Sequence, residues 1–325
     1  MTENLGTADQ SVYSADAPLL SVVVTIGALR RRALRCLDAL LAQTGAPPLQ
    51  IVVVDAAPEF GPPDRPGLDY LPLPACPSIN AAKAAGALRA RAPVVAFLED
   101  HCVPEPGWAA ALHRVFTEQP EVAAAAYAFA NLNPVNWVSR SFLLLAYGPW
   151  MAPVASGPIP TPSWMNVAYR RQVLEQAGGL TDWMGCEGLF LHRLARNGAK
   201  FWQAGDALVR HLNHPGLLGS ARDSACWQRL FAATRVRVDH WSWFRRLAYF
   251  CGAVPFSPSI IAWRLGRRLW TRPELRGAFF RALPLILFVY TYGAFSEALG
   301  YLAGPGGAPR KTIYVETGDP RGEPL

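Results

Sequence analysis

An acidic pair followed by a histidine, Glu99-Asp100-His101, comes directly after the apolar run 94–98. Carboxylate oxygens are ligands for Mg²⁺ and Mn²⁺, and an imidazole nitrogen suits Mn²⁺ better than Mg²⁺. A divalent cation at such a site stabilises negative charge that develops on a leaving group. The triplet therefore predicts a metal-assisted reaction site, and an acidic strand end that caps the next helix is the alternative.

Two more polar residues, Thr25 and Asp55, also end short apolar runs rich in valine. The runs alternate with helical patterns at 28–43 and 79–92. Buried strands that alternate with helices predict an α/β fold with a mostly parallel sheet and right-handed crossovers. Ligands bind such sheets beyond the carboxyl ends of the strands. We therefore expect Thr25, Asp55 and the 99–101 triplet at one edge of the sheet.

The middle of the chain mixes helical patterns with loops. The stretch 148–164 is dense in Pro, Gly and Ser, which predicts a loop over a site. A strand or turn over 164–170 leads into a helix that Gly178-Gly179 closes. The pattern predicts a helix over 186–198 and a strand-turn-strand over 199–214.

Composition points to contact with lipid. Of the 325 residues, 51% are hydrophobic and only 17% are charged, and the net charge is +7. Between Arg229 and Arg281, arginines alternate with Trp, Phe and Leu, a pattern that suits anionic lipid headgroups or an acidic substrate. Because there is no zinc-ligand spacing or RNP-like run, we expect no nucleic acid partner. The six cysteines form no C-x-x-C pair and no secretory signal precedes them, which predicts reduced thiols in the cytosol.

Two apolar stretches lie near the C-terminus, at 247–263 and 282–304. The second has about the length that a bilayer-spanning helix needs. Pro284 and Glu297 interrupt it, so an in-plane or re-entrant helix is an open alternative. The arginines between the stretches are expected on the cytoplasmic side. We therefore expect the protein at the cytoplasmic face of the cell membrane, peripheral or with one or two C-terminal membrane helices.

The ordered set of pieces over residues 19–215 resembles glycosyltransferase family 2. The pieces are SVVVT, IVVVD, NAAKAAG, FLEDH, PGW, NVAYRR, CEGLFLHRL and ALVRH. The resemblance implies a GT-A fold, which is Rossmann-like, with a mostly parallel sheet flanked by helices. It also implies an inverting, metal-assisted transfer of a sugar from a nucleotide-diphosphate sugar to a hydroxyl of a glycan or lipid-linked acceptor.

The resemblance also assigns roles to residues of this chain. It implies a general base at Glu187, which removes the proton of the acceptor hydroxyl. The residues implied to bind the donor are Thr25, Asp55, Lys83, Glu99 and Asp100. The residues implied to bind Mn²⁺ or Mg²⁺ are Asp100, His101 and His211, and those implied to bind the acceptor are Trp164, Asn166 and Arg193.

The resemblance and the composition together predict four segments. These are a flexible N-terminal tail over 1–18, a GT-A domain over 19–225, a basic, apolar, helical membrane-associating region over 226–304, and a flexible C-terminal tail over 305–325.

The chain departs from the family pattern at two places with chemical consequences. His101 stands where the family has its metal-binding Asp, and Gly188 replaces the second acid of a Glu-Asp pair. A catalytically impaired, membrane-docked nucleotide-sugar-binding protein is therefore the alternative. A nicotinamide-dependent oxidoreductase is disfavoured because the loop after the first strand lacks G-x-G-x-x-G. A nucleotidylyltransferase is disfavoured because Arg30-Arg31-Arg32 is a poor match for its Gly-rich basic loop.

Overall fold

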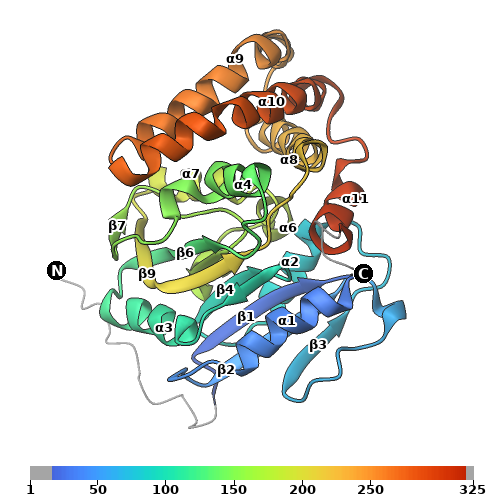
Figure 1. Ribbon diagram of the computed structural model, residues 1–325. Helices are drawn as coiled ribbons and strands as arrows, with labels where there is room; N and C mark the ends of the chain where they lie inside the picture. The colour runs from blue at the N-terminus through green and yellow to red at the C-terminus, as the bar shows by residue number, and fades with distance from the viewer. Residues whose placement is uncertain (1–16, 320–325) are drawn as a thin grey trace, which may run out of the picture.

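A computed structural model describes residues 17–319, so most of the predicted N-terminal tail over 1–18 lies outside the described residues. The strands are β1 (Leu20–Ile26), β2 (Leu49–Asp55), β3 (Leu68–Pro72), β4 (Val94–Glu99), β5 (Cys102–Pro104), β6 (Val122–Asn131), β7 (Gly157–Ile159), β8 (Val167–Arg170) and β9 (Lys200–His211). Within the described range they form one nine-stranded sheet in the order β3-β2-β1-β4-β8-β6-β9-β5, with β7 paired to β9 (Figure 1). The predicted α/β class, with helices flanking a central sheet and an apolar helical C-terminal region, is confirmed.

Helices cover both faces of this sheet. They are α1 (Arg30–Leu41), α2 (Ile79–Arg89), α3 (Trp108–Glu118), α4 (Trp137–Tyr147), α5 (Arg171–Glu175), α6 (Leu180–Trp183), α7 (Glu187–Arg196), α8 (Leu217–Val238), α9 (Trp243–Leu269), α10 (Pro273–Ala303) and α11 (Ala308–Ile313). Short turns η2 (Pro58–Phe60), η3 (Gly148–Trp150) and η4 (Tyr314–Gly318) complete the described chain.

The first half of the sheet is parallel. Strands β3, β2, β1 and β4 pair in parallel, and α1 and α2 provide the crossovers. Val22 and Val24 of β1 join the core beneath α1 and α3, whereas Val23 joins the core beneath α2, α6 and α7. Because both faces of β1, β2 and β4 are buried, these three strands are largely continuous apolar runs, which is why the sequence predicts them correctly.

The second half of the sheet is mixed. Strand β8 pairs antiparallel with β4 and β6, and β9 pairs parallel with β6. The predicted strand-turn-strand over 199–214 is wrong, because β9 is one strand with a bulge. Opposite Tyr127 and Ala128 the partner changes from Ala204 to Leu208, so a few residues around Gly205 leave the ladder without ending the strand.

A layer of long helices lies at one end of the sheet, where α10 packs against α8, α9 and α4 (Figure 1). The apolar stretches 247–263 and 282–304 fall within α9 and α10. The predicted domain boundary at 225 falls inside α8, so this helix carries the chain from the sheet into the helical layer without a linker. By length and composition α10 could cross a membrane, and 33% of its most apolar window is buried within the protein.

The segment 305–319 is folded, in contrast to the predicted flexible tail. Helix α11 packs against α8 and α2, and η4 continues from it toward α1. Two features of the first α/β unit hold it there, namely the guanidinium of Arg32 and the close approach that Gly27 allows to Thr317. The remaining residues, 320–325, lie outside the described range.

Candidate active site

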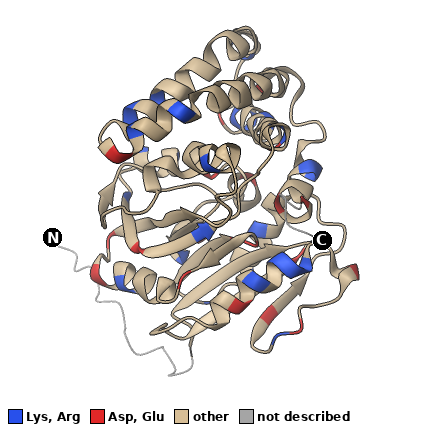
Figure 2. Ribbon diagram, in the orientation of Figure 1, with Lys and Arg blue, Asp and Glu red and all other residues tan. Residues whose placement is uncertain are grey.

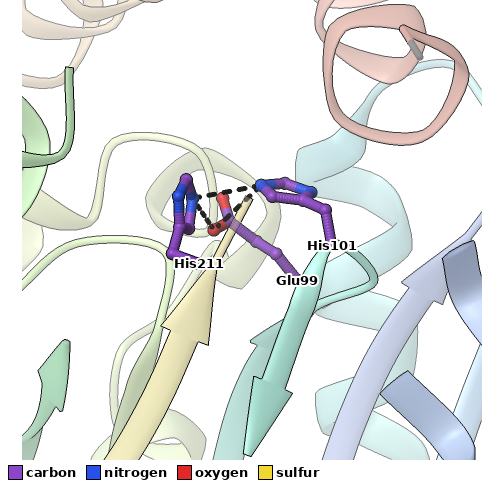
Figure 3. A group of neighbouring side chains, drawn as sticks. All are labelled: Glu99, His101 and His211. Atoms are coloured by element: carbon purple, nitrogen blue, oxygen red, sulfur yellow. Dashed lines mark hydrogen bonds and ion pairs between the residues drawn. The ribbon is translucent and has the colours of Figure 1, made fainter. Parts of the chain in front are cut away.

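Three side chains meet beyond the ends of β4 and β9. Glu99 ends β4, His101 follows in the next turn, and His211 ends β9 (Figure 3). The His101 Nε2 and His211 Nε2 atoms are 3.2 Å apart, and Glu99 Oε2 lies 3.5 Å from the first and 3.4 Å from the second. Pairing of β5 with β9 places His211 opposite Cys102, and this pairing brings two histidines 110 residues apart into contact.

The hydrogen bonds on the far side of each imidazole set its tautomer. His101 Nδ1 lies 3.3 Å from Asp100 Oδ1, and His211 Nδ1 lies 2.9 Å from Asn213 Oδ1. The Asn213 amide nitrogen donates to Asn131 Oδ1 and to the His211 carbonyl, so its oxygen faces the ring and accepts. With protons assigned to both Nδ1 atoms, the two Nε2 lone pairs and the Glu99 carboxylate converge on one point. A cation at that point stabilises all three.

The geometry fits a metal ion. Ligand atoms held tetrahedrally at about 2.1 Å from a common ion lie about 3.4 Å apart, and the three observed separations are 3.2–3.5 Å. Two imidazole nitrogens and one carboxylate suit Mn²⁺ or Zn²⁺ better than Mg²⁺, which prefers oxygen ligands. The structure therefore groups His101 and His211 as the sequence predicts, but it places Glu99 in the group instead of Asp100.

Asp100 lies behind His101 and orients it. Its carboxylate forms a buried ion pair of 2.8 Å with Arg32 of α1, and the same Oδ1 faces the His101 ring. A carboxylate behind a ligating histidine fixes the ring orientation and raises its basicity. The predicted ligand role of Asp100 therefore becomes a supporting one in this geometry.

Asn166 and Tyr147 hold the Glu99 carboxylate. Asn166 Oδ1 accepts from the Glu99 backbone amide at 2.9 Å, and its Nδ2 donates to Glu99 Oε2 and to the Tyr147 hydroxyl. The Tyr147 hydroxyl donates to Glu99 Oε2 at 3.1 Å. Burial, reinforced by the Glu99 charge, raises the pKa of Tyr147 well above its usual value, so it remains a donor. Asn166, predicted to bind the acceptor, is 0% exposed and instead positions Glu99.

A narrow cavity adjoins the cluster at the carboxyl ends of the neighbouring strands β1 and β4. Four of the predicted donor-binding residues line it, which are Thr25, Lys83, Glu99 and Asp100. The space inside it that is open to the centre of a water molecule is about 20 Å³. The chain order reverses direction between β1 and β4, and this is where open α/β sheets bind ligands.

Lys83 connects this cavity to Glu187. The two buried side chains form an ion pair between α2 and the first turn of α7. Lys83 Nζ also donates to the Met165 carbonyl at 3.2 Å and lies 5.2 Å from the centre of the Phe97 ring. Glu187, the predicted base, therefore contacts a residue that lines the cavity, Lys83.

Asp55 is remote from this arrangement. It is fully buried, and Arg30 donates to both of its carboxylate oxygens. The Tyr70 hydroxyl donates to it at 2.7 Å and the Ala57 amide at 2.9 Å. Burial and the bond to Asp55 raise the pKa of Tyr70 to about 12. Because its oxygens are already used, Asp55 stabilises the loop after β2 in this conformation and does not line the cavity.

The two other predicted acceptor residues lie at the surface. Trp164 is 52% exposed and lies two residues before Asn166, at the edge of the cluster. Arg193 is exposed on α7, with its guanidinium 5.5 Å from the centre of the Trp183 ring. The structure therefore leaves Trp164 available near the site and does not bring Arg193 to it.

Sequence reasoning missed four residues that complete the site. Arg32 and Tyr147 support Asp100 and Glu99, Asn213 supports His211, and Glu316 lines the cavity from the far end of the chain. The N-H-P context of Asn213 and the apolar context of Tyr147 carry no pattern that marks them. Of the four, only Arg32 lies in a recognisable sequence pattern, the run of three arginines that begins α1.

No protein-family model matches the sequence, and neither does any curated protein. Among solved structures, the fold is similar to residues 1–349 of TarS from S. aureus, with a TM-score of 0.45 and 12% identity over 87% of this chain and 90% of that chain. A likeness at these values is too weak to assign a function or a site.

Proposed function

We propose that the protein is a metal-assisted glycosyltransferase that moves a sugar from a nucleotide-diphosphate sugar to a hydroxyl acceptor. The observation that carries this proposal is the Glu99, His101 and His211 cluster, placed beside a cavity at the switch point of the sheet. The ordered family 2 motifs over 19–215 support it, because their residues supply the cluster and most of the lining of the cavity.

Each residue has a distinct task in this proposal. A divalent cation, Mn²⁺ by the choice of ligands, would be held by Glu99, His101 and His211 and would neutralise charge on the diphosphate leaving group. Lys83 brings a second positive charge to the same cavity, and the Thr25 hydroxyl brings a donor. The positive groups thus surround the place where leaving-group charge would develop.

Glu187 is the proposed general base. An inverting transfer needs one carboxylate that accepts the proton of the acceptor hydroxyl while that oxygen attacks the anomeric carbon. Lys83, which lines the cavity, holds the Glu187 carboxylate at the start of α7. A negative charge there also benefits from the helix dipole.

We further propose that the helical layer docks on the cytoplasmic face of an anionic membrane and that the acceptor is a glycan or a lipid-linked glycan. Large apolar side chains are exposed along α9 and α10, among them Phe256, Trp263 and Phe295. Arginines recur between them, and Figure 2 shows Lys and Arg along α8 and α9. Aromatic and arginine side chains on one surface suit the headgroup region.

The layer is proposed to lie peripherally. The Glu297 carboxylate of α10 accepts from the Ser257 hydroxyl of α9 and from the Tyr301 hydroxyl, both at 2.7 Å. These bonds hold α10 against its neighbour, and this favours an in-plane pair over an isolated spanning helix.

Ligand binding and donor hydrolysis together test the proposal. In a thermal-shift screen, one nucleoside diphosphate with Mn²⁺ should raise the melting temperature more than nucleotide or Mn²⁺ alone, because a ligand that binds only the folded state stabilises it. The matching sugar nucleotide should then be slowly hydrolysed, and Glu187→Gln should abolish turnover while nucleotide still binds. If no nucleotide shifts the melting temperature of the full chain or of a chain without residues 314–325, the proposal is overturned.

The second candidate is a nucleotide-sugar-binding protein without turnover. Two observations favour it, namely the glycine at 188 and the engagement of Glu187 by Lys83. Binding of a sugar nucleotide with no release of the nucleoside diphosphate, with and without acceptor glycans, would select this candidate.

A further inference from the structure

Glu316, in the last described segment 314–319, lines the cavity, and we name this segment the C-terminal plug. Its backbone is fixed by Arg32, whose guanidinium donates to the Glu316 carbonyl at 2.5 Å and to the Asp319 carbonyl at 2.8 Å. The same guanidinium forms the buried ion pair with Asp100. Arg32 thus joins the plug to the residue that supports His101.

The plug enters the first βα turn closely. A Cβ atom added at Gly27 would lie 2.3 Å from Thr317 Oγ1, so the plug rests directly on the backbone that follows β1. Thr317 and Glu316 are both buried, and Glu316 is part of the cavity lining. Figure 1 shows this end of the chain, after α11, beside the tip of β1 and the start of α1.

This position is the ligand position of the fold. Open α/β sheets bind ligands outside the carboxyl ends of the strands at the switch point, which here lies at the ends of the neighbouring strands β1 and β4. With the plug in place, about 20 Å³ is open to the centre of a water molecule, which is room for about one water. Pockets for small molecules have about 300–1,000 Å³. A nucleoside diphosphate and the plug therefore compete for the same space.

Two buried polar atoms near the plug have no hydrogen-bond partner within the described residues. The Thr25 hydroxyl lines the cavity, is buried and has no hydrogen-bond partner in the described chain. The Arg32 Nε atom is likewise buried without a partner there. Buried polar groups normally have partners, so these two atoms point to a ligand that the plug does not imitate.

We infer that the C-terminal plug is an autoinhibitory segment, which must leave the switch-point cavity before a nucleoside diphosphate binds. This inference rests on the proposed function. Departure of the plug removes two acceptors from Arg32 and opens the cavity above Thr25 and Lys83. The Arg32 N–H groups that held the plug are then available to a diphosphate, while the ion pair with Asp100 remains.

Nucleotide affinity in three proteins tests the inference. Isothermal titration with UDP, GDP, CDP, ADP and dTDP, each with Mn²⁺, compares the full chain, a chain without residues 314–325, and a full chain with Thr317→Tyr. Tyrosine at 317 cannot fit against Gly27, so it displaces the plug and leaves the chain at full length. Lys311→Ala, an exposed change on α11, is the matched control.

For the nucleotide that binds, the truncated and Thr317→Tyr proteins should bind at least tenfold more tightly than the full chain, because the closed state lowers apparent affinity by the open fraction. Lys311→Ala should match the full chain. A synthetic peptide of residues 308–325 should weaken nucleotide binding to the truncated protein. In the full chain, saturating nucleotide should increase amide hydrogen exchange at 315–318.

The outcomes separate the plug from the proposed function. Equal affinities in all proteins, or weaker binding after truncation, overturn the plug and leave the nucleotide site standing. If circular dichroism shows that every protein folds and yet none binds any of the five nucleotides, both the proposed function and the plug are overturned. If the truncated protein does not fold, Thr317→Tyr and the exchange experiment decide.

Discussion

Lys83 and Glu187 form an ion pair in the interior between α2 and α7, 104 residues apart in the chain. Neither side chain has much contact with solvent, so each charge depends on the other for compensation. Removing one partner of such a pair leaves an uncompensated buried charge, whereas removing both leaves an apolar contact.

Lys83→Met should therefore destabilise the fold by about 3–5 kcal/mol, and the double variant Lys83→Met/Glu187→Leu should recover most of that loss. Urea unfolding followed by circular dichroism measures both values. Arg114→Met, which breaks the exposed pair with Asp206, is the control and should cost less than about 1 kcal/mol. If Lys83→Met and the double variant lost equal free energy of unfolding, the two charges would not be coupled.

The cluster of Glu99, His101 and His211 predicts how strongly different variants bind Mn²⁺. The full chain should bind one Mn²⁺, His211→Ala should abolish binding, and Asn213→Ala should weaken it about 10–100-fold because it removes the acceptor behind the ligand. Isothermal titration in the absence of nucleotide measures these affinities, and circular dichroism confirms that each variant folds. His192→Ala, exposed on α7, should bind like the full chain. Unchanged binding in His211→Ala would exclude the cluster as the site.

The helical layer predicts salt-dependent binding to anionic vesicles. Replacing the exposed residues Arg264, Arg267 and Arg281 with alanine should weaken partition into phosphatidylserine vesicles by roughly 100-fold, at about 1 kcal/mol for each arginine. Sedimentation with vesicles measures the partition.

The matched control for this experiment removes the same charge elsewhere. Arg31, Arg91 and Arg196 are exposed outside the helical layer, and their replacement with alanine should change partition much less. If both triple variants weaken partition equally, net charge alone controls binding. If the full chain stays unbound at low salt, the membrane face is excluded.

Cysteine reactivity reports the packing around α1 and on α9. Burial raises the pKa of Cys36 far above its usual value and that of Cys186 to about 12, so both should remain unreactive thiols even at pH 9. The exposed Cys251 of α9 should react with a maleimide within minutes, and anionic vesicles should protect it. Peptide mass spectrometry locates the label. Labelling of Cys36 at the rate of Cys251 would contradict the packing of α1 against β4.

The sequence predicts the parallel half of the sheet, because buried strands are continuous apolar runs. The family resemblance implies a metal site at Asp100, His101 and His211, and the structure groups the two histidines with Glu99. The sequence does not predict β9 as one strand, since the bulge near Gly205 looks like a turn.

It also fails to assign Glu99 and Asp100 correctly within the triplet. Neighbouring side chains in an extended segment point to opposite sides, and Arg32 and Asn166 decide which carboxylate faces the histidines. These partners lie 68 and 67 residues away from Asp100 and Glu99, so no local pattern reports them. The sequence does not predict the position of the plug for the same reason. The plug is a polar segment, and the residues that it contacts, Gly27 and Arg32, lie far away in the sequence.

The bond between Arg32 and Glu316 joins residues 284 positions apart, so Glu316 is made long after Arg32. Ribosomes add about 5–20 residues each second, so the growing polypeptide carries Arg32 for about 15–60 s before its partner is made. During synthesis the first βα unit therefore has an uncovered pocket, and a nascent chain stalled before residue 314 should already capture nucleotide.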